Sequence, residues 1–358
     1  MNFYIPEYWA SLASQYPELM TGRITLQEKG MYRIRTVTGE QNALVSGRFQ
    51  FDAQAVSDYP AVGDYVMADC ADPDTAVIHQ VLPRKSLFVR KAAGTSKTEQ
   101  VVAANIDTVF LCMSLNNDFN LRRLERYLAV AWESGANPVV LLTKADLCED
   151  ISRKQAEVAS IAMDVTVLAT SAMESDGYRQ IMPYVTEGRT VAFVGSSGVG
   201  KSTLINRLLG EERLATDGLR NDDKGHHITT HRELLLLPNG AMVIDTPGMR
   251  ELGMWDAASG VEQTFADIEE LAARCRFRNC SHTSEPGCAV RDALDNGGLD
   301  AGRWQSYQKL KNENLYAADS ESYLAAKEKR FKEISKINKH NKKRVCPKFC
   351  VNTEMRCK

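Results

Sequence analysis

One segment of the chain, residues 190–209, reads as a buried strand, a glycine-rich loop and a helix: TVAFV, GSSGVGKS and TLINRLL. The loop matches the pattern G-x-x-x-x-G-K-[ST], whose glycines let backbone N–H groups approach phosphate oxygens closely. Lys201 would place its charge on the β- and γ-phosphates, and the Ser202 hydroxyl would ligate Mg²⁺. Because the helix points its positive end at this loop, the segment predicts a phosphate site in an α/β sheet. The predicted phosphate-binding residues are Gly195, Ser196, Ser197, Gly198, Val199, Gly200, Lys201, Ser202 and Thr203.

A second motif, Thr143-Lys144-Ala145-Asp146, follows the apolar run PVVLL and resembles the [NT]KxD loop that reads guanine. The Asp146 carboxylate would accept hydrogen bonds from guanine N1–H and the 2-amino group, a pattern that adenine lacks. The Lys144 stem would lie along the base. Ser171 and Ala172 follow the run DVTVLAT and would form the second base-contacting loop. The predicted base-binding residues are Thr143, Lys144, Asp146, Ser171 and Ala172.

The order of these motifs is unusual, because base-reading loops normally follow the phosphate loop of a GTPase. A parallel sheet carries its binding loops at the carboxyl edge of the strands, whatever their order along the chain. The original termini can therefore be joined, and a new break can open in a surface loop. The motif order predicts a circularly permuted GTPase domain.

The Mg²⁺ and γ-phosphate side of the site is predicted from Asp245-Thr246-Pro247-Gly248, which follows the apolar run AMVI. An aspartate at the end of a strand can hold Mg²⁺ through water, and Gly248 can offer its amide to the γ-phosphate. Thr229 and Thr230 precede a strand, where a threonine can complete the Mg²⁺ shell. We expect Ser202, Thr229 and Asp245 to hold Mg²⁺, with Thr230 as the alternative threonine.

Water activation is predicted to depend on a histidine. The residue after the DTPG motif, where many GTPases place a water-orienting glutamine, is Met249. Methionine cannot polarise water, whereas an imidazole can orient or deprotonate a water near neutral pH. His227 lies beside the threonines and is the best candidate, with His226 and His231 as neighbours. The predicted catalytic residues are His227, Lys201, Thr229 and Thr230.

The chain is predicted to be multidomain. Short β-like pieces separated by turn residues fill residues 22–93 and predict a small closed barrel or sandwich. An OB-like barrel is compatible with this pattern, although strand spacing alone does not select it. From residue 104 strands alternate with helices, which predicts a mostly parallel sheet covered on both faces. The expected division is an N-terminal segment plus barrel (1–95), the permuted GTPase domain (96–255) and a mainly helical zinc-binding domain with a basic tail (256–358).

Three of the nine cysteines and one of the six histidines form the pattern C-x₄-C-x-H-x₅-C, which suits a closed tetrahedral zinc site of structural type. The predicted zinc ligands are Cys275, Cys280, His282 and Cys288. Three isolated cysteines lie in or beside apolar stretches and read as small buried thiols: Cys70, Cys112 and Cys148. No metal is assigned to the three cysteines of the tail: Cys346, Cys350 and Cys357.

The composition, 44% hydrophobic and 25% charged, is that of a globular protein. No apolar run approaches the roughly 20 residues of a membrane span, and the first 20 residues resemble no export signal, so we expect a cytoplasmic location. The net charge of −2 conceals a tail, residues 327–358, with about twelve Lys or Arg against three acidic residues. Such a tail, with a barrel and a zinc module, suits RNA. Candidate contacts in a basic stripe are Arg84, Lys85, Arg90 and Lys91.

Taken together, the barrel, TKAD, SA, GSSGVGKST, HITT, DTPG and the cysteine cluster occur in an order that resembles the ribosome small-subunit-dependent GTPase A (RsgA) family. The likeness spans roughly residues 22–320. It implies an OB-fold, a permuted GTPase domain and a zinc domain. It also implies GTP hydrolysis stimulated by the small (30S) ribosomal subunit during late subunit maturation, with the subunit and its rRNA as partners of a monomer.

Two positions match the family and one departs from it. Members place a histidine before the switch threonines, as His227 is here, and a hydrophobic residue after DTPG, as Met249 is. Where the family often has a threonine after that histidine, this chain has Ile228. Two other functions stay open on the residues alone: a nucleotide-gated RNA-binding scaffold with negligible turnover, and an ATPase.

Overall fold

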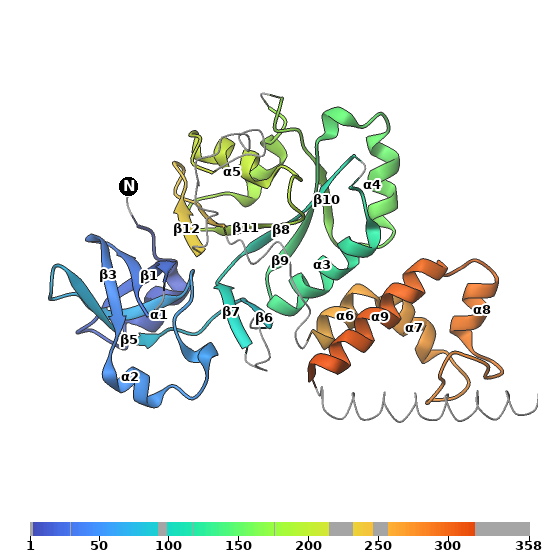
Figure 1. Cartoon of the computed structure of the whole chain (residues 1–358), viewed down its shortest axis with the longest axis horizontal. Coiled ribbons are helices and arrows are strands. Elements are labelled where there is room, and N and C mark those ends of the chain that lie inside the picture. The colour runs from blue at the N-terminus through green and yellow to red at the C-terminus, as the bar shows by residue number, and fades with distance from the viewer. Residues whose placement is uncertain are drawn as a thin grey trace, which may run out of the picture.

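A computed structural model describes residues 3–28, 30–91, 99–116, 118–174, 176–214, 232–245 and 257–318. Within them a barrel, a central α/β sheet and a group of helices follow one another along the chain, as the sequence predicts. The barrel and the C-terminal helices lie on opposite sides of the central sheet (Figure 1). None of the helices in these ranges combines the length and the apolar character needed to cross a membrane.

The N-terminal barrel contains β1 (Met20–Gln27), β2 (Tyr32–Thr36), β3 (Gly39–Val45), β4 (Tyr65–Asp69) and β5 (Thr75–Val81). The strands pair in the order β1-β2-β3-β5-β4, and the barrel closes where β4 returns to β1. Only the β3–β5 pairing is parallel, as expected for an OB-like barrel. The helix α2 (Gly47–Asp52) and the short turn η1 (Val56–Asp58) connect β3 to β4.

The helix α1 (Glu7–Ala13) packs on the outside of this barrel. Trp9 is 4% exposed and stacks on Tyr65 with ring centroids 4.3 Å apart. The Lys85 ammonium lies 4.4 Å from the Trp9 ring and 4.1 Å from the Tyr8 ring. The aromatic residues near the N-terminus therefore cover the barrel.

The central sheet has the strand order β10-β9-β8-β11-β13-β12. Its members are β8 (Thr108–Ser114), β9 (Asn137–Thr143), β10 (Thr166–Ala169), β11 (Thr190–Val194), β12 (Arg232–Leu236) and β13 (Met242–Asp245). All pairings are parallel except β12 with β13. Side chains that alternate along the strands enter two cores. One core includes α3 (Leu121–Ser134) and α4 (Ile151–Ala159), and the other includes α5 (Lys201–Leu209) and η3 (Arg179–Tyr184), so both faces are covered.

Two connections between the parts have no signal in the local sequence pattern. β1 pairs with β12 through Leu26 and Gln27, which makes the barrel and the central sheet one eleven-stranded sheet. A separate hairpin of β6 (Leu87–Lys91) and β7 (Glu99–Ala104) lies between them (Figure 1). The expected boundary at residue 95 falls between these two strands, and the three-part division at residues 95 and 255 remains a prediction.

The C-terminal helices are α6 (Ala258–Thr264), α7 (Ala266–Ala273), α8 (Ala289–Asp295) and α9 (Ala301–Ala318). Both α6 and α9 contact α3 of the central domain. At the α3–α6 crossing, a Cβ on Gly260 would lie 2.0 Å from the Ala129 carbonyl oxygen. Only glycine permits this close approach of two helix backbones.

Candidate nucleotide and metal sites

The predicted nucleotide-binding loops follow parallel strands at one edge of the central sheet. Asp146 comes after β9, Lys201 after β11, and Asp245 is the last residue of β13. The strands β9, β8, β11 and β13 are neighbours in this order and all run parallel, so their carboxyl ends lie at one edge of the sheet. The structure thus brings together loops that are about 100 residues apart in the sequence.

The phosphate loop lies against the neighbouring strand β8. A Cβ on Gly195 would lie 2.5 Å from the Cys112 carbonyl oxygen, so no larger residue fits there without moving the backbone. Gly200 has φ +98 and directly precedes α5, which begins at Lys201. The Lys201 ammonium donates to the carbonyl oxygens of Gly195 (2.6 Å) and Ser196 (2.5 Å), and so lies over the loop.

The base-reading loops are tied to the phosphate loop and to each other. Thr143 is 3% exposed, and its hydroxyl donates to the Val199 carbonyl at 2.6 Å. The Ser171 hydroxyl donates to Asp146 Oδ1 at 2.7 Å, and the Ala145 amide donates to the Thr170 carbonyl. Ser171 therefore orients the carboxylate that is predicted to read the base.

The Mg²⁺ side of the site is described only in part. Ser202 lies in the first turn of α5, and Asp245 is half-buried at the end of β13. A hydroxyl and a carboxylate at one sheet edge are hard oxygen ligands of the kind that Mg²⁺ prefers. The predicted switch and catalytic residues His227, Thr229, Thr230 and Gly248 lie outside the described ranges, as does Met249.

One buried thiol, Cys112, lies beside the phosphate loop and has a shifted pKa. Burial raises the pKa of Cys112 to about 12, against the opposing charge of Lys201. A thiol with this pKa stays neutral at physiological pH and acts as a small apolar side chain under the loop. This agrees with the sequence interpretation for Cys112, whereas Cys70 and Cys148 are only partly buried.

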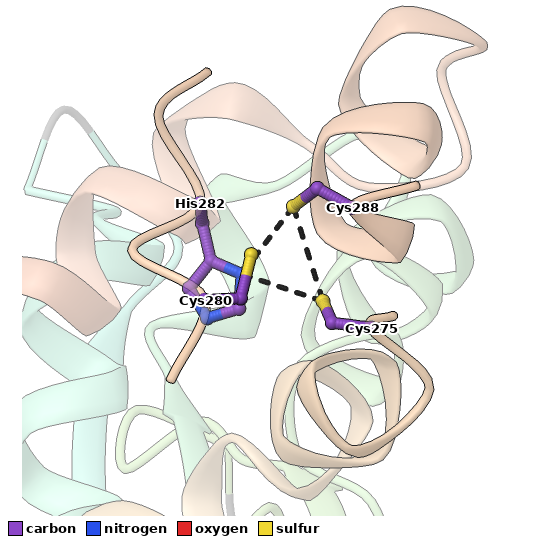
Figure 2. Close-up of side chains that lie close together, drawn as sticks. All are labelled: Cys275, Cys280, His282 and Cys288. Carbon is purple, nitrogen blue, oxygen red and sulfur yellow. Dashed lines mark hydrogen bonds between the residues drawn. The ribbon is translucent and has the colours of Figure 1, made fainter. Parts of the chain in front are cut away.

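The four predicted zinc ligands converge in the C-terminal helices, as Figure 2 shows. Cys275 follows α7, Cys280 and His282 lie in the next loop, and Cys288 is the N-cap of α8. Their four ligand atoms all lie within 4.8 Å of one another. His282 has φ +58, a strained conformation for a non-glycine residue that often marks a functional position.

The spacing of these atoms fits a tetrahedral zinc ion. Zn–S and Zn–N bonds of about 2.3 and 2.0 Å require S···S and S···N separations of about 3.8 and 3.5 Å. The observed separations are 3.9 Å between Cys275 Sγ and Cys288 Sγ, and 3.6 and 3.4 Å from His282 Nδ1 to these sulfurs. Three of the four ligand atoms are therefore spaced as a tetrahedral zinc ion requires, and the fourth, Cys280 Sγ, lies within 4.8 Å of them.

The proposed basic stripe is wrong for Arg84, whose side chain is only 15% exposed. Its guanidinium pairs with the buried Asp64 at 2.7 Å and donates to the carbonyls of Ser57 and Tyr59. A charge buried against its counter-ion cannot face an RNA phosphate. Lys85 is engaged with Tyr8 and Trp9, and the side chains of the other two stripe residues lie outside the described set.

Sequence reasoning missed two residues that shape the site. Gly177 lies under the second base loop, where a Cβ would come 2.0 Å from the Ser171 carbonyl oxygen. Arg123, on α3, donates to Ser196 Oγ of the phosphate loop at 2.6 Å. A lone glycine or arginine outside a motif carries no signal, because its role arises from contacts between segments distant in sequence.

A P-loop domain whose base-reading loops precede its phosphate loop is a circularly permuted GTPase. The family model described as RsgA GTPase matches residues 81–255. The chain is 51% identical over 296 residues to the small ribosomal subunit biogenesis GTPase RsgA 2 of Lactiplantibacillus plantarum, covering 82% of this chain and 83% of that protein. It is 48% identical over 310 residues to the RsgA of Opitutus terrae, covering 84% of each.

Solved structures agree with these relatives. The crystal structure of YjeQ from Thermotoga maritima matches with a TM-score of 0.61 and 26% identity, over 83% of this chain and 99% of that chain. That of YloQ, a circularly permuted GTPase, matches with a TM-score of 0.60 and 26% identity, over 83% and 95%. The chain belongs to the RsgA family of GTPases.

Proposed function

We propose that this chain is a GTPase that acts in biogenesis of the small ribosomal subunit, binds that subunit and its rRNA, and hydrolyses GTP faster when bound. The relatives named above carry the biogenesis role in their names. The observation that carries the nucleotide assignment is the hydrogen bond from Thr143 to Val199, which joins the base loop to the phosphate loop. The protein is proposed to work as a cytoplasmic monomer.

Each part of the site has a proposed role. Asp146, oriented by Ser171, reads guanine, and the loop from Gly195 to Thr203 holds the phosphates. Lys201 leaves the loop carbonyls for the β- and γ-phosphates, because their negative charge attracts it more strongly than neutral carbonyls do. The Gly248 amide contacts the γ-phosphate.

Mg²⁺, held by Ser202, Asp245 and Thr229 or Thr230, would neutralise the charge that develops on the phosphates. His227 orients the attacking water, because Met249 has no polar group with which to do so. A zinc ion at Cys275, Cys280, His282 and Cys288 would be structural, because four protein ligands leave no position open for a reactant.

The proposal is tested by turnover and co-sedimentation. We expect GTP hydrolysis to accelerate on addition of purified 30S subunits, and the protein to pellet with them better in a non-hydrolysable GTP analogue than in GDP. A rate unchanged by the subunit, with binding retained, would identify the scaffold instead. A variant that separates binding from hydrolysis is His227→Ala. It should bind nucleotide normally but lose the acceleration of GTP hydrolysis by 30S subunits.

A further inference from the structure

Arg123 connects α3 to the phosphate loop. The Asn120 side chain caps α3 by accepting from the Arg123 amide at 3.1 Å, so this residue lies in the first turn of the helix. One arm of its guanidinium donates to Ser196 Oγ at 2.6 Å. The other donates to the Asp118 carbonyl at 2.5 Å and to Asp118 Oδ1 at 2.8 Å. The guanidinium is therefore held from two sides.

Ser196 is the position through which this contact reaches the nucleotide site. It is partly buried, whereas the next residue, Ser197, is exposed. The Ser196 carbonyl accepts from Lys201, so the residue that Arg123 holds also supports the lysine predicted to bind the phosphates. Tyr127 lies one turn further along α3, and the nearby Ser196 side chain opposes the rise in the Tyr127 pKa that burial causes. Arg123 and Tyr127 therefore place one face of α3 beside the first turn of the loop.

The adjacent face of α3 holds the C-terminal helices. Arg126 makes a two-armed pair with Glu313 of α9, at 2.6 and 2.9 Å. Glu125 is fully buried, and its Oε1 accepts from Arg303 of α9 at 2.9 Å and from Arg122 at 2.6 Å. Figure 1 shows α3 between the central sheet and α6 and α9, so one helix contacts both the phosphate loop and two of the C-terminal helices.

We propose that Arg123 is a positioning residue for the phosphate loop, and that through it α3 couples nucleotide binding to the docking of the C-terminal helices. Arg123 and Arg126 share one helix backbone, so a small rotation or shift of α3 moves both side chains together. A partner that displaces α9 would thereby change the hold of Arg123 on Ser196. The proposal rests on the proposed GTPase function.

The first experiment is a double-mutant cycle on the release of fluorescent GDP from the full chain. Arg123→Gln and Ser196→Ala should each speed release by about ten- to a hundredfold, the loss of one charged hydrogen bond. The double variant should release GDP no faster than the faster of the two single variants, because both substitutions remove the same contact. Ser196→Ala carries the test if Arg123→Gln does not fold.

The matched control is Arg153→Gln on α4, whose side chain is 74% exposed and pairs with Glu157. It should leave GDP release and the unfolding midpoint unchanged. Arg123→Lys keeps the charge but cannot reach Ser196 and Asp118 together, so it should not restore wild-type release. Additive effects in the cycle, or wild-type release from Arg123→Gln, would overturn the positioning role.

The coupling is tested on α9. Arg126→Glu should repel Glu313 and speed GDP release, and Glu313→Arg in the same chain should restore it toward the wild-type rate. Wild-type release from Arg126→Glu would overturn the coupling and leave the Arg123 contact standing. Failure of the wild-type chain to bind any guanine nucleotide would instead refute the proposed function, so the two failures are distinguishable.

Discussion

Replacing Glu125 should loosen the C-terminal helices from α3 without changing the nucleotide loops directly. Glu125 is fully buried, and one of its oxygens accepts from both Arg303 and Arg122. Arg303 is itself 5% exposed, with Asp267 as its other carboxylate partner at 2.7 Å. Removing the Glu125 charge therefore leaves a buried guanidinium with half of its anionic contacts.

The size of the effect follows from these contacts. Glu125→Gln keeps an oxygen that can accept both hydrogen bonds, but its amide carries no charge to balance the two guanidinium groups, and we expect a cost of about 2 kcal/mol in total. Glu125→Leu removes both bonds and should cost about 3–5 kcal/mol, as for other broken buried pairs. The exposed pair of Arg35 and Glu40 provides the control, because Glu40→Gln should cost less than about 1 kcal/mol.

Urea unfolding of each variant, followed by tryptophan fluorescence and circular dichroism, measures these differences. Trp304 of α9 stacks on Tyr307 and meets His282 edge to face, so its emission reports on the C-terminal helices. The expected order of stability is wild type, then Glu125→Gln, then Glu125→Leu. If both variants unfold within about 0.5 kcal/mol of wild type, the buried charge cluster does not hold the helices together.

Three further predictions concern the sites themselves. Gly195→Ala should weaken GDP binding by at least about tenfold, because the new Cβ would lie 2.5 Å from the Cys112 carbonyl oxygen, whereas Gly47→Ala meets open space and should be neutral. Asp146→Asn should lower GDP affinity by about a hundredfold or more and favour xanthine nucleotides, measured by competition binding. Cys280→Ser should lower bound zinc from one ion per chain toward zero, measured by elemental analysis of the purified protein.

Different outcomes would contradict each of these. Wild-type GDP affinity in Gly195→Ala would mean that the loop adapts by backbone movement. Unaltered base preference in Asp146→Asn would remove the guanine assignment and favour an ATPase. Full zinc occupancy in Cys280→Ser, or absence of zinc from the wild-type protein, would mean that the cluster is not a four-ligand zinc site.

Local signals predicted much of this fold. The run TLINRLL is helical as predicted and lies within α5 (Lys201–Leu209), and α3 ends before Gly135, whose φ of +78 suits glycine. The turn at Asn239 and Gly240 joins the antiparallel strands β12 and β13. These features depend on hydrophobic period and turn chemistry, which act over a few residues and can be read from the chain directly.

Charged residues were harder to interpret than strands and helices. Arg84 looked like a surface cation but pairs with buried Asp64, and Arg123 carried no motif but reaches Ser196. A charged side chain has the same local pattern whether it faces water, an ion pair or a loop. Its partner is set by how distant segments pack, which no local periodicity records.

The sequence alone determined the class of site, because a glycine loop, a base-reading aspartate and a cysteine cluster each need particular residues at short spacing. It also determined that the domain is permuted, since motif order is a property of the chain. Only the tertiary structure decided how the parts are joined: β1 pairs with β12, and α3 carries Arg123 on one face and Glu125 on the next. Such contacts depend on strand register and helix packing across the whole chain, and these are settled only when the segments meet.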